Sequence, residues 1–142
     1  STAESCTGGE LSHLITSVSG SSQYFLGGIC TYQIQKKTEI LGVSEDLIKE
    51  KTVVSEEVAQ AMSLGCQKLF KTDIALSTTG VAGPNSDEFE SEIGTVFYSI
   101  RVHNFEKTFK LYLPHLERKD FMNFVSMKVL QDLIEILIKE KV

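Results

Sequence analysis

The residues most able to do chemistry lie near the start of the chain, in the run Glu4-Ser5-Cys6-Thr7-Gly8-Gly9. A small nucleophile such as Ser5, placed where a strand turns into a helix, is held at a sharp bend. Backbone N–H groups at the start of that helix can face an oxyanion or a phosphate, and glycines let the backbone approach a ligand closely. The run alone leaves three interpretations open: a nucleophilic serine, an anion-binding turn, or a helix N-cap whose glycines serve packing.

A nucleophilic serine needs a base, and no Ser-His-Asp triad is visible in the sequence. All three histidines are expected to be surface or packing residues: His13, His103 and His115. A lysine can act instead if burial or a neighbouring cation lowers its pKa from about 10.4 and leaves the amine partly neutral. The candidates are Lys36 and Lys37, just after Tyr32. Because adjacent residues on a helix cannot face the same site, at most one of them is the base.

A second candidate site is the run Ser77-Thr78-Thr79-Gly80-Val81-Ala82-Gly83-Pro84. A strand that ends in hydroxyl residues and continues into a glycine-rich loop is a common ligand cradle in α/β folds. The run has neither the GK[ST] ending of a Walker A loop nor the GxGxxG spacing of a dinucleotide loop. It is therefore a candidate binding loop, with a purely structural turn as the alternative.

The remaining pattern supplies the elements that must hold these two runs. Strands are expected over residues 1–5, 24–32, 73–79, 93–102 and 106–113, the last two joined as a hairpin. Helices are expected over about 8–19, 33–41, from Ser44, over 55–70 and from Leu116 onward, with Ser44 and Ser55 as N-caps followed by acidic residues. The strand at 24–32 is apolar enough to be buried, and Gly27-Gly28 suggests a bulge or a close backbone approach. The last helix is expected to face the core with Phe121, Phe124, Val125, Val129, Leu133, Ile136 and Leu137. This order predicts one α/β domain in which helices cover both faces of a mixed sheet.

Composition places the chain among soluble globular proteins. Its 142 residues are 42% hydrophobic and 23% charged, which fits one domain. The net charge of −5 argues against nucleic acid as a partner. No apolar run approaches the roughly 20 residues that span a bilayer, and the first residues lack the features of a secretory signal. We therefore expect a cytoplasmic protein without a membrane partner; because no initiator Met is present, it is expected to be processed or cut from a longer chain.

The three cysteines, Cys6, Cys30 and Cys66, are odd in number, widely spaced and without a CxxC pair. They predict neither a disulfide framework nor a zinc site. Cys30 and Cys66 lie in apolar segments and are expected to be buried. Cys6 differs because it lies inside the first candidate site. No other ligand set points to a metal or a cofactor.

Several of these runs together resemble the CinA C-terminal domain family. The resemblance is carried, in order, by residues 2–9, 20–25, Gly27-Gly28, Thr31-Tyr32, Lys37, Leu41-Gly42-Val43, residues 54–59, residues 79–84 and Gly94-Thr95-Val96. It covers about residues 2–100, and a weaker helical tail follows. TAESCTGG and TGVAGP at this spacing are specific to the family.

The resemblance implies a three-layer α/β/α sandwich with a mixed β-sheet. It implies a single domain over residues 1–142 that lacks the family's N-terminal helix and the start of its first strand. The implied activity is that of a metal-independent amidohydrolase without a cofactor. Its substrate would be a small-molecule nucleotide, nicotinamide mononucleotide, whose carboxamide is hydrolysed to give nicotinate mononucleotide and ammonia. Family members also occur fused behind a molybdopterin-binding-like domain linked to competence, which these residues do not contain.

Position by position, the resemblance makes Ser5 the nucleophile and Lys37, rather than Lys36, its general base. The other implied site residues are Tyr32 and Thr79 as supporting groups, and Thr7, Gly8, Gly9, Gly80, Gly83 and Arg118 as substrate-binding groups. The turn at residues 7–9 would supply N–H groups to the oxyanion. Lys37 would take the Ser5 proton, Ser5 would attack the amide carbon, ammonia would leave, and water would hydrolyse the acyl-enzyme.

Two departures from the family pattern affect substrate binding. After Gly83-Pro84 the family usually has more glycines and a short basic stretch, whereas residues 85–92 here carry four carboxylates. These should repel a nucleotide phosphate if the loop borders the site. The last helix commonly opens with two arginines a turn apart; here Arg118 remains and Met122 takes the second position. Loss of a planar, bidentate phosphate donor is not a conservative change.

Two other interpretations remain open at the level of sequence. The chain could be a non-catalytic or regulatory nucleotide-binding domain that keeps the fold but has lost phosphate recognition. Alternatively, Cys6 could be the nucleophile in place of Ser5. The sequence does not fix the oligomeric state, and a homo-oligomer is compatible with a domain of this size.

Overall fold

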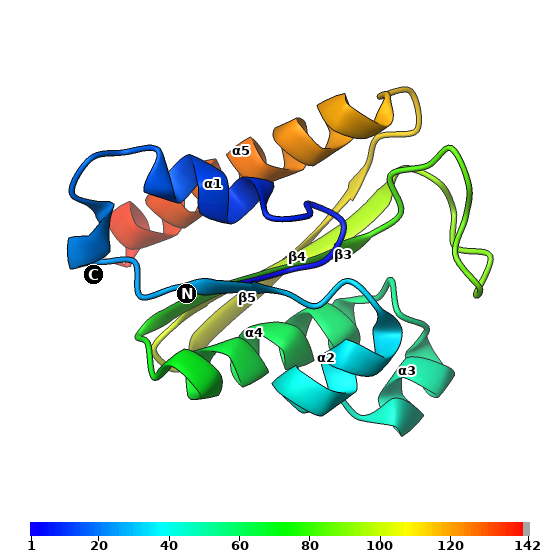
Figure 1. The fold of residues 1–142 in the computed structure, drawn as a ribbon, viewed down its shortest axis with the longest axis horizontal. Coiled ribbons are helices and arrows are strands. Elements are labelled where there is room, and N and C mark those ends of the chain that lie inside the picture. Colours follow the sequence, from blue (N-terminus) through cyan, green and yellow to red (C-terminus); the bar gives the residue numbers. More distant parts are fainter. Residues whose placement is uncertain (141–142) are drawn as a thin grey trace.

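The computed structural model describes residues 1–140, and its strands form one sheet in the order β2-β1-β3-β4-β5 (Figure 1). The strands are β1 (Thr2–Glu4), β2 (Gly28–Cys30), β3 (Ile74–Gly80), β4 (Thr95–Val102) and β5 (Phe105–Tyr112). β1 pairs in parallel with β2 and β3, whereas β3 with β4 and β4 with β5 are antiparallel. The mixed sheet expected from the sequence is confirmed.

Helices cover both faces of this sheet. They are α1 (Glu10–Thr16), α2 (Ile34–Leu41), α3 (Glu45–Lys51), α4 (Glu56–Phe70) and α5 (Arg118–Lys139), with a short 3-10 helix at Ser21–Gln23. α1 and α5 lie on one face, and α2, α3 and α4 lie on the other (Figure 1). The three-layer α/β/α sandwich is therefore confirmed.

Each face of the sheet has its own hydrophobic core because successive side chains of a strand point to opposite faces. On β4, Tyr98 and Ile100 are buried under α1 and α5, while Phe97 packs on the side of α4. The Tyr98 hydroxyl donates to Asp132 Oδ2 at 2.5 Å, which satisfies a buried polar group and ties α5 to the sheet. The sheet is thus fixed from both sides.

Two helix starts follow directly from local sequence. The Ser44 hydroxyl accepts a hydrogen bond from Leu47 N at the start of α3, and the Ser55 hydroxyl accepts one from Val58 N at the start of α4, both at 3.3 Å. Acidic residues follow each serine and complement the helix dipole. Both predicted N-caps are confirmed.

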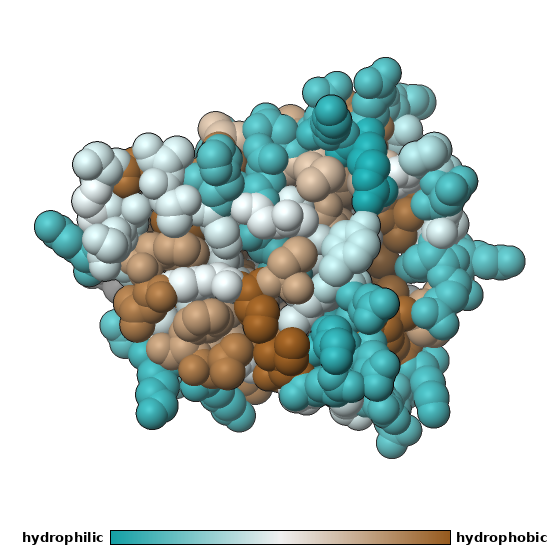
Figure 2. Space-filling view, in the orientation of Figure 1, coloured by the Kyte–Doolittle hydropathy of each residue, from teal (hydrophilic) through white to brown (hydrophobic). Residues whose placement is uncertain are grey.

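The prediction of a buried strand over residues 24–32 is wrong. Only residues 28–30 form β2, an edge strand that pairs with β1 alone. Two of the preceding side chains, Tyr24 and Leu26, are each 62% exposed. Figure 2 shows hydrophobic residues on this side of the molecule, over β2 and α4. The expected close approach is present, since a Cβ at Gly28 would overlap the Thr2 hydroxyl. Apolar composition alone did not distinguish a short edge strand from a central one.

Two burial expectations also fail. Cys30 is exposed because it belongs to this edge strand, whereas Cys66 is buried as expected. Phe124 is 46% exposed, because the core-facing row of α5 passes through Phe121, Val125 and Val129 and leaves it on the outer side of the helix. The other α5 positions expected to face the core are buried or packed against it.

Gly65 on α4 controls how closely α2 approaches, because a Cβ there would overlap the carbonyl oxygen of Leu41. Alanine normally stabilises a helix relative to glycine by about 1 kcal/mol. We nevertheless expect Gly65→Ala to lower the free energy of unfolding by about 1–3 kcal/mol through overpacking, as measured by urea unfolding. Lys68→Ala, an exposed α4 substitution, is the control and should change little; a stabilised Gly65→Ala would contradict the close approach.

Candidate functional site

Ser5 directly follows β1, at the carboxyl end of the parallel strands. The residue is 8% exposed, and β1 pairs with β2 on one side and β3 on the other. In open α/β sheets, ligands bind at the carboxyl ends of strands. The first candidate run therefore lies where a binding crevice is expected.

Lys37 reaches this point from α2, and the residue is 1% exposed. Its Nζ lies 2.9 Å from Ser5 Oγ, 2.6 Å from the Thr31 carbonyl oxygen and 3.3 Å from the Tyr32 carbonyl oxygen. Lys36 points away and pairs with Glu39 at 2.6 Å on the exposed side of the helix. Of the two candidate lysines, only Lys37 contacts Ser5.

The surroundings of Lys37 favour a neutral amine. Burial lowers the pKa of Lys37 from 10.5 to about 8, and the nearby Cys6 and Cys30 thiols oppose this only partly. Within residues 1–140 the amine forms no salt bridge. A lysine with such a pKa is partly deprotonated near neutral pH and can accept a proton.

A cavity of about 830 Å³ opens above Ser5 and Lys37. Most of the expected site residues line it: Ser5, Tyr32, Lys37, Thr79, Gly80, Gly83 and Arg118. The two candidate runs therefore meet at one cavity. Thr79 lines the cavity wall while its hydroxyl donates to the Val53 carbonyl at 2.8 Å, so this side chain holds the wall in place.

Arg118, the first residue of α5, joins two walls of this cavity. One guanidinium nitrogen donates to the Tyr32 hydroxyl at 2.6 Å, and the other donates to the Gly83 carbonyl at 2.8 Å. Met122, one turn later, lies beside the first turn, since a Cβ at Gly8 would be 3.1 Å from its Cε. The α5 start thus brings one cation to the cavity where the family pattern has two.

Three expected substrate-binding residues do not line the cavity: Thr7, Gly8 and Gly9. The Gly8 N–H donates to the Ser5 carbonyl at 3.0 Å, and the Thr7 hydroxyl donates to Glu4 Oε1 at 2.7 Å. These groups build the turn that follows Ser5. In contrast, Cys6 lines the cavity, and its N–H donates to no other residue among residues 1–140.

The Cys6 thiol is poorly suited to replace Ser5 as nucleophile. Burial raises the pKa of Cys6 from 9.0 to about 12. A thiol with this pKa is almost entirely protonated at neutral pH. Because the thiolate is the reactive form, Cys6 would be a weak nucleophile. The three histidines do not line the cavity either, within the residues that the structure describes.

The acidic loop, residues 85–92, borders the cavity. Its first half contributes Asn85, Ser86, Asp87 and Glu88 to the lining. Asp87 accepts hydrogen bonds from the Phe89 N–H, the Ser91 N–H and the Ser91 hydroxyl at 2.7–3.0 Å, so its charge is partly compensated within the loop. Glu88 is exposed and is the carboxylate of this loop best placed to repel an anion.

Sequence reasoning missed three residues around the site. Lys49 on α3 adds a cation to the cavity lining. Glu4 and Thr78 lie behind Ser5, where Thr78 Oγ1 accepts a hydrogen bond from the Ser5 N–H at 3.3 Å. Glu4 and Thr78 belong to the two candidate runs, so their presence was visible. The Thr78 contacts join residues more than 70 positions apart, and the Glu4 contacts with residues 7, 11 and 12 depend on the geometry of the turn, so neither set has a local signature.

Residues 1–137 match the sequence profile of the family described as the CinA C-terminal domain. The chain belongs to this family. As a CinA C-terminal domain, it is 52% identical over 100 residues to a CinA-like protein of Flavobacterium psychrophilum and 45% identical over 126 residues to one of Geotalea uraniireducens. These matches cover 70% and 89% of the chain but 24% and 30% of the relatives. The chain thus spans less than a third of the length of these curated relatives.

Solved structures of CinA-superfamily proteins share the fold. The Escherichia coli protein superposes with a TM-score of 0.91 at 27% identity, covering 96% of this chain and 78% of that one. A Klebsiella pneumoniae protein gives a TM-score of 0.93 at 27% identity, covering 97% of this chain and 86% of that one. The competence/damage inducible protein CihA of Agrobacterium tumefaciens gives a TM-score of 0.89 at 28% identity, covering 94% of this chain and 82% of that one. The similarity therefore includes all three layers of the sandwich.

The described residues also define what the CinA domain does not contain. Between residues 1 and 140, no helix is both long and apolar enough to cross a bilayer. In the same part of the chain, no three His, Cys, Asp or Glu side chains are grouped as metal ligands would be.

The lowered pKa of Lys37 links stability to pH. Between about pH 8 and 10.5 the folded chain loses this proton while the unfolded chain keeps it, so stability rises with pH in that window. From pH 7 to 9.5 we expect the free energy of unfolding of the wild type to gain about 2 kcal/mol relative to Lys37→Met, measured by urea unfolding. The exposed Lys36→Met serves as control and should follow the wild type. Parallel curves for wild type and Lys37→Met would show that the Lys37 pKa is not lowered.

Proposed function

We propose that this CinA domain is an amidohydrolase that deamidates nicotinamide mononucleotide through a Ser5–Lys37 dyad. The observation that carries the proposal is the 2.9 Å contact between Lys37 Nζ and Ser5 Oγ in the wall of the cavity. The substrate itself is inferred from the family resemblance. The dyad supplies the chemistry that an amide substrate requires.

The contacts of Lys37 orient the lone pair of its neutral amine. A neutral primary amine has two N–H donors and one lone pair. The Thr31 and Tyr32 carbonyls can only accept hydrogen bonds, so they take the two N–H groups. The lone pair then faces Ser5 Oγ, the one partner that can donate a proton. This arrangement presents Lys37 as a base toward Ser5.

The reaction follows from this orientation. Lys37 accepts the Ser5 proton as Oγ forms a bond to the carboxamide carbon, and the carbonyl oxygen becomes an oxyanion. The C–N bond breaks, Lys37 returns the proton to the leaving nitrogen, and ammonia departs. Water, deprotonated by Lys37, then hydrolyses the acyl-Ser5 ester to release nicotinate mononucleotide and restore the serine.

The oxyanion needs donors that are not already used. The Ser5 N–H donates to Thr78 and the Gly8 N–H donates to the Ser5 carbonyl. We assign the role to the Cys6 N–H, which follows the nucleophile, belongs to a residue that lines the cavity and donates to no other residue among residues 1–140. Such a preorganised donor is worth about 3–4 kcal/mol in known acyl-transfer enzymes.

The first test is ammonia release from nicotinamide mononucleotide. We expect Ser5→Ala and Lys37→Met each to lower kcat by about a thousandfold or more, while Lys36→Met, which alters only an exposed ion pair, retains activity. The value of kcat/KM should rise with pH to a plateau above about pH 8, the pKa of Lys37. Turnover by Ser5→Ala would overturn the nucleophile. Nucleotide binding by a folded wild type without turnover would favour the regulatory binding domain instead.

The second test concerns the acidic loop. Glu88 is exposed and lines the cavity, whereas Glu90 is exposed but lies outside the lining. Because a like charge near the phosphate disfavours binding by roughly 0.5–1 kcal/mol at an exposed site, Glu88→Gln should lower KM about two- to fivefold with kcat unchanged. Glu90→Gln is the matched control. Equal KM values for the two variants would show that the phosphate lies away from Glu88.

A further inference from the structure

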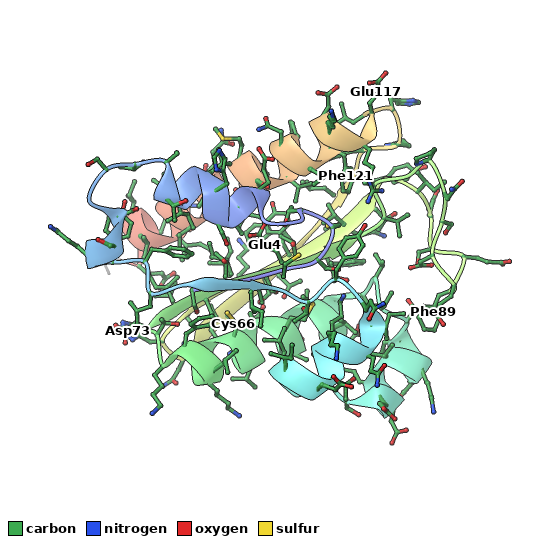
Figure 3. The ribbon with its side chains drawn as sticks, viewed as in Figure 1. Glu4, Cys66, Asp73, Phe89, Glu117 and Phe121 are labelled. Carbon is green, nitrogen blue, oxygen red and sulfur yellow. The ribbon has the colours of Figure 1, made fainter. Side chains whose placement is uncertain are left out.

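A buried carboxylate lies directly behind the candidate nucleophile. Glu4 is 1% exposed and lies between β1 and the first turn of α1 (Figure 3). Its Oε2 accepts from the Ser12 N–H at 3.0 Å and the Ser12 hydroxyl at 2.8 Å. Its Oε1 accepts from the Leu11 N–H at 2.8 Å and the Thr7 hydroxyl at 2.7 Å. Four donors therefore converge on one carboxylate, which also caps the N-terminus of α1 in place of a side chain at Gly9.

The branch through Thr7 continues to Ser5. Thr7 Oγ1 lies 2.9 Å from Thr78 Oγ1, and Thr78 Oγ1 accepts from the Ser5 N–H at 3.3 Å. Ser5, Thr78 and Thr7 are buried, as is Glu4. The chain of hydrogen bonds thus runs from the backbone of Ser5, through two hydroxyls on different elements, to the Glu4 carboxylate.

The carboxylate fixes the direction of every bond in this chain. An ionised carboxylate only accepts, so the single Thr7 hydroxyl proton goes to Glu4. The hydrogen bond between the two threonines must then use the Thr78 proton, with Thr7 as acceptor. Thr78 Oγ1 is left to accept the Ser5 N–H. One anion therefore selects a single arrangement of hydroxyl protons, which two threonines alone would not do.

We propose that Glu4 is a positioning residue for Ser5, acting through Thr7 and Thr78 to hold the backbone of the nucleophile in the orientation that directs Oγ toward Lys37. The inference rests on the proposed role of Ser5. It assigns functions to Glu4 and Thr78 and gives Thr7 a role behind the nucleophile rather than at the substrate. The Ser12 branch, which leads away from Ser5 toward α1, provides a natural internal control.

Two substitutions separate the branches. Thr7→Val removes the hydroxyl that connects Glu4 to Thr78 and retains the side-chain shape. Ser12→Ala removes a hydroxyl bound to the same carboxylate at nearly the same distance, together with its 2.7 Å contact to Thr2 Oγ1, but leaves the chain to Ser5 intact. Thr78→Val interrupts the chain without touching Glu4, and Thr7→Ser restores the hydroxyl. Circular dichroism and urea unfolding establish that each variant is folded.

The readout is the rate at which a fluorophosphonate probe phosphonylates Ser5, followed by mass spectrometry of the peptide that contains it. This rate reports on the serine without requiring any particular substrate. We expect Thr7→Val and Thr78→Val to react about 10- to 100-fold more slowly than wild type, and Thr7→Ser and Ser12→Ala to remain within about threefold of it.

The outcomes distinguish this inference from the proposed function. If wild-type Ser5 is labelled and Thr7→Val reacts as fast as Ser12→Ala, the positioning role is wrong and the nucleophile stands. If both variants slow equally, Glu4 acts only through the stability of α1, and the positioning role is again wrong. If wild-type Ser5 is not labelled, the nucleophile assignment fails and the positioning role fails with it.

Discussion

The burial of one amine among uncharged acceptors is the constraint on which the rest of the site depends. Lys37 Nζ is held by two backbone carbonyls and a hydroxyl, and no salt bridge within residues 1–140 compensates its charge. The lowering of its pKa from 10.5 to about 8 corresponds to roughly 3 kcal/mol against the protonated form. Packing elsewhere in the fold offsets this unfavourable free energy, as is common at functional sites.

Several elements must be placed together for this burial to occur. The Thr31 and Tyr32 carbonyls follow β2, an edge strand of three residues, and their position depends on the pairing of β2 with β1. The amine comes from α2, whose close packing on α4 depends on the absence of a side chain at Gly65. The hydroxyl comes from the end of β1. Three short elements with little stability of their own thus converge where β1 ends, and the long β3–β5 sheet and α4 provide the rigid support.

Local sequence was sufficient where a contact lies within a few residues. The Ser44 and Ser55 caps, the hairpin of β4 and β5, and most of the α5 core row were all predicted from patterns of short range. The choice of Lys37 over Lys36 came from family resemblance, because the local pattern of adjacent lysines cannot show which one is buried. The contact of Lys37 with Ser5, 32 residues away, required the structure.

The failures have the same physical origin. The apolar composition of residues 24–32 indicates burial only if another strand or helix covers them, and β2 lies at the edge of the sheet. Phe124 matches the helical period loosely but lies on the outer side of α5. Glu4 satisfies N–H groups seven and eight residues later, whereas N-cap rules describe side chains two or three residues before the bonded N–H. A separation of seven or eight residues between the acceptor and the N–H group is set by the geometry of the turn and not by residue type.

The contacts of Arg118 have one more consequence. Its guanidinium is held by a phenolic hydroxyl and a backbone carbonyl, both neutral, so its position is fixed while its positive charge is left uncompensated by these partners. An anion entering the cavity would not have to displace a bound carboxylate in order to meet this charge. The energetic cost of ordering this flexible cation is therefore met before an anion binds, and the charge of Arg118 can offset part of the repulsion from the carboxylates of the acidic loop.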